Sequence, residues 1–130
     1  MNREHRDYLE DILASIDETQ EFTDGLSFEE FCQDRKTINA VIRSLEVLGE
    51  AAKQIPEEIR VRTPSIPWKE MAGMRDKLIH NYFGVDLTIV WTAIHEELPQ
   101  MRPEIERLLD SLTGESPESG EKGVSDGIDG

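Results

Sequence analysis

Apolar residues recur every three to four positions over long stretches of this chain, a spacing typical of amphipathic helices. One such stretch covers about residues 4–22, and a second covers about residues 27–54. The second begins with Ser27 and Glu30, whose spacing is that of a helix capping box. No stretch alternates apolar and polar residues as a half-buried strand does. The pattern therefore predicts an all-α protein.

Two prolines indicate where the next helices begin. Pro56 suits the first position of a short helix over residues 56–62, and Pro67 suits the first position of a long helix over residues 67–81. Gly84 is the expected terminator of the long helix, because glycine readily adopts the positive φ that is common just after a helix.

A last helix is predicted over residues 87–112, with Asp86 as its N-cap. Its apolar positions stay in phase across Pro99 and Pro103. Because the stripe is not interrupted, we expect the two prolines to kink the helix rather than to end it.

The composition changes after residue 113. Residues 114–130 hold five of the nine glycines and almost no apolar side chain, so ordering them would bury too little surface to offset the lost entropy. We therefore expect one helical domain, residues 1–113, followed by a disordered acidic tail, residues 114–130. The domain is predicted to be an up-and-down bundle of four long helices and one short helix.

The charge of the chain limits its partners. The formal net charge is −14, which argues against a protein that coats nucleic acid. The charge is uneven, however: residues 1–34 carry 2 basic and 11 acidic side chains, whereas residues 35–77 carry 9 basic and 6 acidic ones. An anionic ligand is therefore expected to approach the middle of the chain.

Three further features concern the compartment. Cys32 is the only cysteine, no apolar run is long enough to span a membrane, and the N-terminus is charged from its third residue. These features predict a cytoplasmic protein with neither a signal peptide nor a membrane segment.

The stretch MRDKLIHNYFG, residues 74–84, places Arg75, His80 and Tyr82 close together near the predicted end of a helix. An arginine binds phosphate oxygens with its planar fork, a histidine moves a proton, and a tyrosine adds a hydroxyl. RNA cleavage without a metal needs a base for the 2′-hydroxyl proton and a cation for the charge that builds on the phosphoryl oxygens. One histidine per chain is little for both an acid and a base, and two chains would supply both, so the motif and the heptad-like last helix favour a homodimer.

Structural roles are the alternatives for these residues. A histidine near a helix end commonly caps the helix or packs at the edge of the core, and Tyr82 could anchor the helix end. Three scattered histidines without metal-ligand spacing predict no metal site, and no glycine-rich loop suggests a nucleotide cofactor. His95, Cys32, Trp68 and Trp91 are predicted to be core or boundary residues.

The chain also resembles the HepT-like branch of the HEPN superfamily. The resemblance lies in GEAAKQIP at 49–56, PW at 67–68, GMRDKLIHNYFGVDLTIVW at 73–91 and the amphipathic last helix. It implies a HEPN-type helical bundle that dimerises with its R-x4-H motifs facing each other, and a metal-independent endoribonuclease. Attack by the 2′-oxygen on the adjacent phosphorus is expected to leave a 2′,3′-cyclic phosphate.

The resemblance further implies a role as the toxin of a type VII-like toxin–antitoxin pair. The antitoxin would be a minimal nucleotidyltransferase that silences the toxin by adding AMP to the motif tyrosine. Position by position, the motif arginine matches Arg75 and the polar residue after it matches Asp76. The motif histidine matches His80, and the modified tyrosine matches Tyr82.

Two functional interpretations remain open. In the first, the protein is the ribonuclease toxin, and basic residues guide RNA to the cleft; the candidates are Lys53, Arg60, Arg62, Lys69 and Lys77. In the second, it is a non-catalytic helical subunit that binds the substrate of a minimal nucleotidyltransferase or pairs with that enzyme, which the overall acidity favours. The intact motif favours the first.

Overall fold

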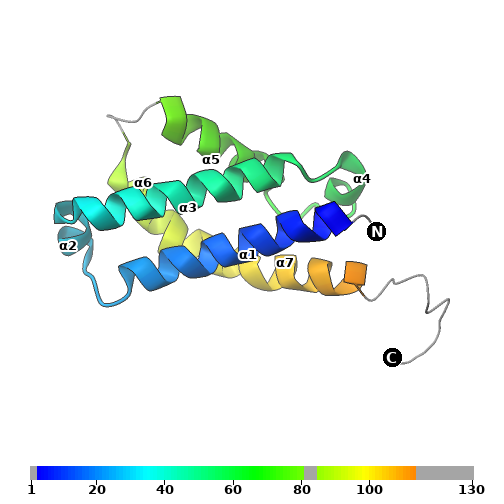
Figure 1. Ribbon diagram of the computed structural model, residues 1–130, viewed down its shortest axis with the longest axis horizontal. Coiled ribbons are helices and arrows are strands. Elements are labelled where there is room, and N and C mark those ends of the chain that lie inside the picture. Colours follow the sequence, from blue (N-terminus) through cyan, green and yellow to red (C-terminus); the bar gives the residue numbers. More distant parts are fainter. Residues whose placement is uncertain (1–2, 81–84, 114–130) are drawn as a thin grey trace.

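A computed structural model describes residues 3–80 and 85–113, and every regular element in these ranges is a helix (Figure 1). The elements are α1 (Arg3–Thr23), α2 (Phe28–Gln33), α3 (Arg35–Lys53), α4 (Glu57–Arg60), α5 (Trp68–His80), α6 (Leu87–Thr92), a π-helical turn (Ala93–Glu97) and α7 (Leu98–Thr113). The predicted all-α class is confirmed. The residues of the predicted tail and of the expected helix terminator, Gly84, lie outside the described ranges.

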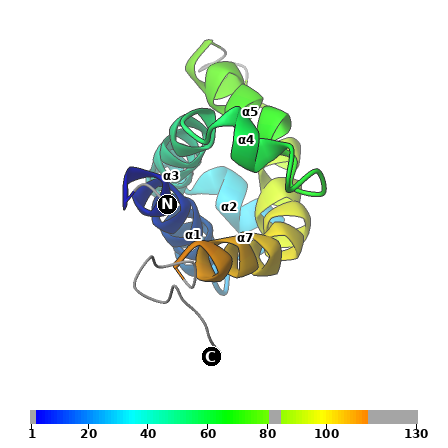
Figure 2. The same cartoon turned by 90° about the vertical axis from the view of Figure 1, so that its right-hand side faces the viewer.

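The long helices run up and down beside one another. α1 lies between α3 and α7, while α5 packs on the other side of α3 (Figures 1 and 2). Successive long helices point in opposite directions, as short connections require. In the ranges that the structure describes, none of the helices combines the length and the apolar composition that a membrane span requires.

The core is built from the apolar stripes that the periodicity predicts. Leu9, Ile12 and Ile16 of α1 are fully buried. They share one core cluster with buried side chains of the other long helices and of the π-helical turn, namely Val41, Leu45, Leu48, Met71, Ile94, Leu98 and Ile105. Each such aliphatic side chain contributes roughly 1.5–3 kcal/mol by leaving water, so the stripes account for the stability of the bundle.

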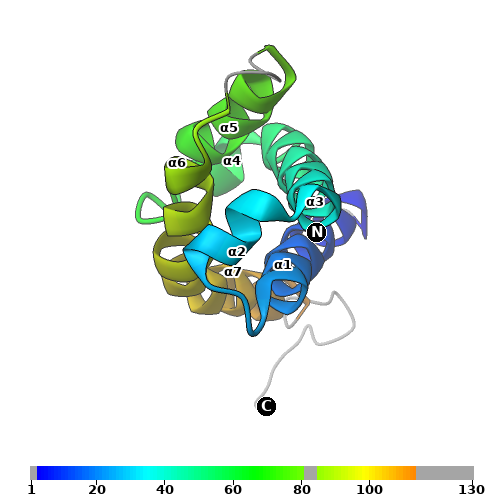
Figure 3. The same ribbon diagram turned by 90° about the vertical axis from the view of Figure 1, so that its left-hand side faces the viewer.

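The prediction of one continuous helix over residues 27–54 is wrong, because the helix is broken at Asp34. α2 ends at Gln33, and the Asp34 carboxylate then caps α3 by accepting from the Thr37 backbone N–H at 3.1 Å and from its hydroxyl at 2.7 Å. The break turns α2 across one end of the bundle, as Figure 3 shows. There the rings of Phe28 and Phe31 lie 5.8 and 5.2 Å from the ring of Trp91.

The last helix continues past its prolines, as the apolar stripe predicts, and the irregularity takes the form of a π turn. The Leu98 N–H donates to the Ala93 carbonyl, five residues back. Pro99 has no N–H to continue this pattern, so the Ile94 carbonyl lacks a donor from its own helix. The side-chain amide of Gln20, on α1, donates to that carbonyl instead.

Candidate functional site

The candidate site lies where α5 crosses α3, and Gly49 makes the crossing possible. A Cβ atom at residue 49 would lie 2.4 Å from the Arg75 Cβ and 2.9 Å from the Met71 carbonyl oxygen. Both distances are shorter than van der Waals contact, so any larger residue would force the helices apart. Gly49 therefore seats Arg75 directly against α3.

Two carboxylates hold the Arg75 guanidinium. Its Nε lies 3.2 Å from Glu50 Oε1, and its Nη1 lies 3.3 Å from Asp76 Oδ1. The second oxygen of Glu50 accepts from the Gln54 amide at 3.1 Å, which fixes the carboxylate on α3. A guanidinium carries five N–H donors, so two carboxylate contacts leave donors for a phosphate. The Arg75 side chain is 32% exposed, which leaves it accessible.

Lys53 completes the group. Its ammonium lies 3.2 Å from Asp76 Oδ1 and lowers the pKa of Asp76 through a hydrogen bond, and Arg75 acts in the same direction. We call Glu50, Lys53, Arg75 and Asp76 the Arg75 cluster. It contains two positive and two negative side chains, so its formal charge is balanced in the absence of a ligand.

The other motif residues are placed only in part. His80 is the last residue of α5, five positions after Arg75 on the same helix, and its side chain is not among those described. Tyr82 lies outside the described residues. The structure thus joins Arg75, Asp76 and Lys53, while the geometry of His80 and Tyr82 around them stays a prediction.

Arg60 has a structural contact that its sequence position does not reveal. Its guanidinium donates to the Ala52 carbonyl at 2.7 Å and to the Ile55 carbonyl at 2.9 Å. Ala52 lies in the last turn of α3 and Ile55 follows the helix, and positive charge is favourable at this end. Arg60 therefore caps α3, the helix that carries Gly49 and Glu50.

The remaining basic candidates are exposed. Lys69 and Lys77 project from α5, and Arg62 follows α4. Of the five residues predicted to guide RNA, Lys53 is the one that belongs to the Arg75 cluster, through its contact with Asp76.

The structure also places the aromatic, histidine and cysteine side chains that the sequence singles out. Trp68 is buried, and its indole N–H donates to the Thr63 hydroxyl at 3.0 Å, so it is a core residue. His95 is exposed rather than part of the core, although its ring lies 4.2 Å from that of Trp91, and desolvation lowers its pKa, which favours the neutral ring. Cys32 is a half-buried free thiol. Across residues 3–80 and 85–113, no group of three potential metal ligands occurs.

Sequence reasoning missed Gly49 and Glu50 as parts of the site. A glycine inside a helical pattern is unfavourable by about 1 kcal/mol relative to alanine, so its presence is a signal of close packing. The glutamate gave no such signal, because an acidic residue on a helix face usually points to water.

These observations define a helical-bundle protein with an arginine-centred site that suits phosphate, followed by a histidine on the same helix. The match to a family model agrees with this class: the model described as "Ribonuclease HepT-like" covers residues 12–108. The chain belongs to the HepT-like ribonuclease family, and the resemblance inferred from its sequence is confirmed.

Relatives support the assignment over most of the chain. The probable ribonuclease HepT of Thermococcus cleftensis is 51% identical over 108 residues, which are 83% of this chain and 98% of the relative. Two others are named as candidate RNases. The one from Methanocaldococcus jannaschii is 45% identical over 114 residues, or 88% of this chain and 94% of the relative. The one from Caldanaerobacter subterraneus subsp. tengcongensis is 46% identical over 104 residues, or 80% and 93%. No solved structure matches the chain.

Proposed function

We propose that the protein is a metal-independent endoribonuclease that acts as the toxin of a toxin–antitoxin pair. The observation that carries the proposal is Arg75, held by Glu50 and Asp76 at a helix crossing and followed by His80 five residues later on the same helix. The membership of the HepT-like ribonuclease family supports RNA as the substrate.

The proposed reaction is an internal phosphoryl transfer. A histidine takes the proton from the 2′-hydroxyl, whose oxygen bonds to the adjacent phosphorus as the bond from phosphorus to the 5′-oxygen breaks. The leaving 5′-oxygen takes a proton, and the product ends in a 2′,3′-cyclic phosphate. Arg75 stabilises the charge on the phosphoryl oxygens. Since each chain contributes one His80, a homodimer supplies base and acid from two chains.

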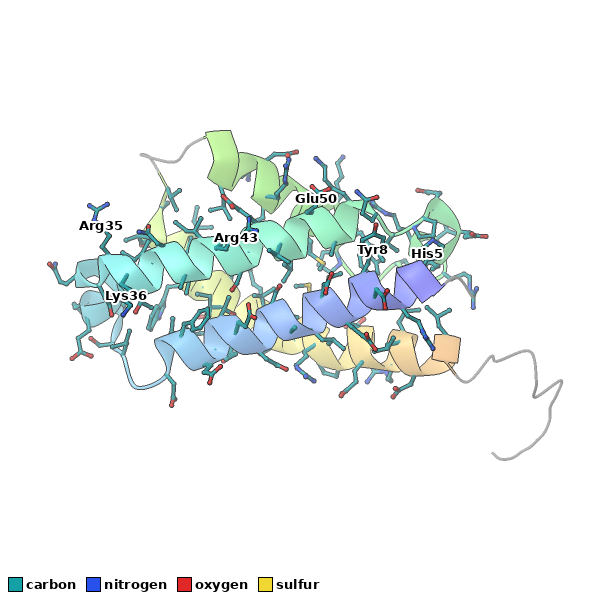
Figure 4. The ribbon with its side chains drawn as sticks, in the orientation of Figure 1. His5, Tyr8, Arg35, Lys36, Arg43 and Glu50 are labelled. Atoms are coloured by element: carbon teal, nitrogen blue, oxygen red, sulfur yellow. The ribbon has the colours of Figure 1, made fainter. Side chains whose placement is uncertain are left out.

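Substitution of Arg75 and His80 tests the mechanism. Arg75→Ala and His80→Ala should each lower the rate of RNA cleavage roughly 10²–10⁴-fold while the helical circular dichroism stays unchanged. Chelation by EDTA should leave the rate unchanged, because the mechanism uses no metal. The matched control is Lys36→Ala, which removes a cation near the opposite end of α3 (Figure 4). Full activity in either motif variant, or inhibition by EDTA, would falsify the mechanism.

Four exposed basic side chains are proposed to guide RNA to the cleft, namely Lys53, Arg62, Lys69 and Lys77. We leave Arg60 out, since its guanidinium is engaged at the end of α3. Loss of one guiding cation should weaken RNA binding and make that binding less sensitive to salt.

The proposed antitoxin is a minimal nucleotidyltransferase that adds AMP to Tyr82. The added group is a bulky anion two residues past His80, where its phosphate can bind the Arg75 guanidinium in place of the RNA phosphate. Co-expression with the transferase should raise the intact mass by one AMP, and peptide mapping should place it on Tyr82. Tyr82→Phe should keep most of the ribonuclease activity and should no longer be silenced by the transferase. An added mass on another residue, or none, counts against this role for Tyr82.

A second candidate function is a non-catalytic partner of the same transferase. The net charge of −14 and the balanced charge of the Arg75 cluster favour it, because both weaken the attraction of RNA. Expression of this chain alone separates the two candidates: growth arrest that His80→Ala abolishes is expected only of the toxin.

A further inference from the structure

A groove lies over the outer face of α3, next to the Arg75 cluster. It has a volume of about 350 Å³ and is lined by Tyr8 and Asp11 of α1, by Arg75 of α5, and by Arg43, Glu46, Val47, Glu50 and Ala51 of α3. Figure 4 shows Arg43 and Glu50 along α3, and Tyr8 on α1 beside the Glu50 end. The groove thus includes the arginine that is proposed to bind the reacting phosphate.

The lining has three kinds of surface. Val47 and Ala51 form an apolar floor, and Tyr8 contributes an aromatic ring. Glu46 and Asp11 are acceptors of hydrogen bonds when ionised, and Arg43 and Arg75 are donors. The apolar and aromatic surface suits a flat ring, the acceptors suit N–H groups at the edge of that ring, and the arginines suit phosphates on either side of it. A nucleotide of single-stranded RNA has this form, because its base stacks on aromatic side chains and exposes its Watson–Crick edge.

We propose that this groove binds the base of the nucleotide beside the cleaved bond and that Glu46 selects guanine. The inference rests on the proposed ribonuclease function and adds its base specificity. Arg75 holds the reacting phosphate, and Arg43 holds a neighbouring one. The carboxylates between them repel phosphate, so the base rather than the backbone enters the middle of the groove.

Guanine follows from the chemistry of a carboxylate. An ionised carboxylate only accepts, and it has two oxygens side by side. Guanine presents two adjacent donors, N1–H and N2–H, on its Watson–Crick edge. Adenine and cytosine each present an exocyclic amino group, which donates, beside a ring nitrogen, which accepts. Uracil presents one N–H between two carbonyls. Each of these three sets an acceptor against a carboxylate oxygen.

Glu46 is available for this contact. Its nearest ionic partner is Arg43, three residues earlier on α3, at 4.0 Å, and the Arg43 side chain is 76% exposed. The Glu46 side chain itself is 25% exposed, but an ion pair this long whose arginine faces water is weak, so little is lost when the base displaces it. Glu50, by contrast, is engaged by both Arg75 and Gln54.

Binding of uncleavable RNA tests the inference separately from catalysis. Two 2′-O-methyl pentanucleotides, UUGUU and UUAUU, lack the 2′-hydroxyl nucleophile, and their affinity for the full chain is measured at one salt concentration. The wild type should bind the guanine oligonucleotide about tenfold more tightly. Glu46→Gln should reduce that preference to about twofold or less, since an amide replaces one acceptor with a donor.

Two further variants make the result specific. Arg43→Gln should weaken both oligonucleotides by the same factor, as a phosphate contact does. Glu21→Gln makes the same charge change on an exposed α1 residue outside the groove and should leave both affinities unchanged. Equal affinity of the wild type for the two oligonucleotides, failure to bind either, or a preference that survives Glu46→Gln overturns the proposal. Guanine preference without any His80-dependent cleavage would overturn the ribonuclease mechanism but would still support guanine binding in the groove.

Discussion

At the scale of single residues, the site depends on Gly49, which has no side chain, and on the charged side chain of Glu50. Gly49 has no Cβ to collide with Arg75, and the carboxylate of the next residue, Glu50, forms an ion pair with Arg75, whose Nε lies 3.2 Å away. The glycine is unfavourable in a helix by about 1 kcal/mol, and the close approach of α3 and α5 compensates for it. The same turn of α3 therefore brings the arginine close and fixes the direction of its guanidinium.

Glu50→Gln tests whether the carboxylate positions Arg75. The variant keeps the size of the side chain but removes the charge, so one of the two ionic contacts of Arg75 is weakened. We expect kcat for RNA cleavage to fall by only about tenfold, because Arg75 retains its contact with Asp76. KM and the melting temperature should change little. The NMR chemical shift of the Arg75 Nε should move in the variant, because its ionic partner has lost its charge. An unchanged kcat together with a moved signal would show that the contact with Glu50 does not limit the reaction.

At the scale of elements, one contact between α1 and the last helix depends on Pro99. Pro99 leaves the Ile94 carbonyl without a helical donor, and Gln20 supplies one from α1. Farther along, Arg102 of α7 makes two 2.8 Å hydrogen bonds to the Asp17 carboxylate of α1 and lowers the pKa of Asp17. The first of these contacts is part-buried and the second is exposed, so the first is expected to matter more for stability.

Gln20→Leu should lower the free energy of unfolding by about 1–3 kcal/mol, because it leaves a carbonyl without a donor. Chemical denaturation followed by circular dichroism measures this. Gln100→Leu, at an exposed position of α7, is the matched control and should change stability by less than about 0.5 kcal/mol. Equal effects of the two substitutions would mean that the Gln20 contact contributes nothing of its own.

At the scale of the whole molecule, the expected homodimer needs apolar surface outside the core. Most of the stripe of the last helix is buried within the chain, whereas Ile89 of α6 is 64% exposed. It lines a groove of about 180 Å³ with Met74 and Leu78 of α5, the helix that carries Arg75. A dimer formed through this groove would place the two motif helices near each other.

Ile89→Asp should therefore convert a dimer into a monomer and abolish cleavage with it. Light scattering at micromolar concentration gives the mass, and Val61→Asp is the control, since Val61 is 62% exposed after α4 and outside this groove. The wild type should have twice the mass of one chain, and so should the control. A monomeric wild type with full activity would refute the two-chain active site.

The sequence by itself determined the all-α class, the apolar stripes and the motif residues. These properties are local: the spacing of apolar side chains sets which face of a helix leaves water, and a motif is a string of neighbours. The family could be inferred from the same local strings, and the comparison with known proteins confirmed it. The π turn was only half foreseen, because the prolines indicate an irregularity without specifying its hydrogen bonds.

The tertiary structure alone decided which distant residues meet. The break at Asp34 became evident only once α2 was seen to turn toward Trp91. Glu50 and Arg75 are far apart in the sequence, and their contact depends on how α5 crosses α3 at Gly49. Periodicity shows which face of a helix is buried but not which helix covers it, and the crossing is set by the packing of side chains from both helices. That packing makes an ordinary surface glutamate part of the site.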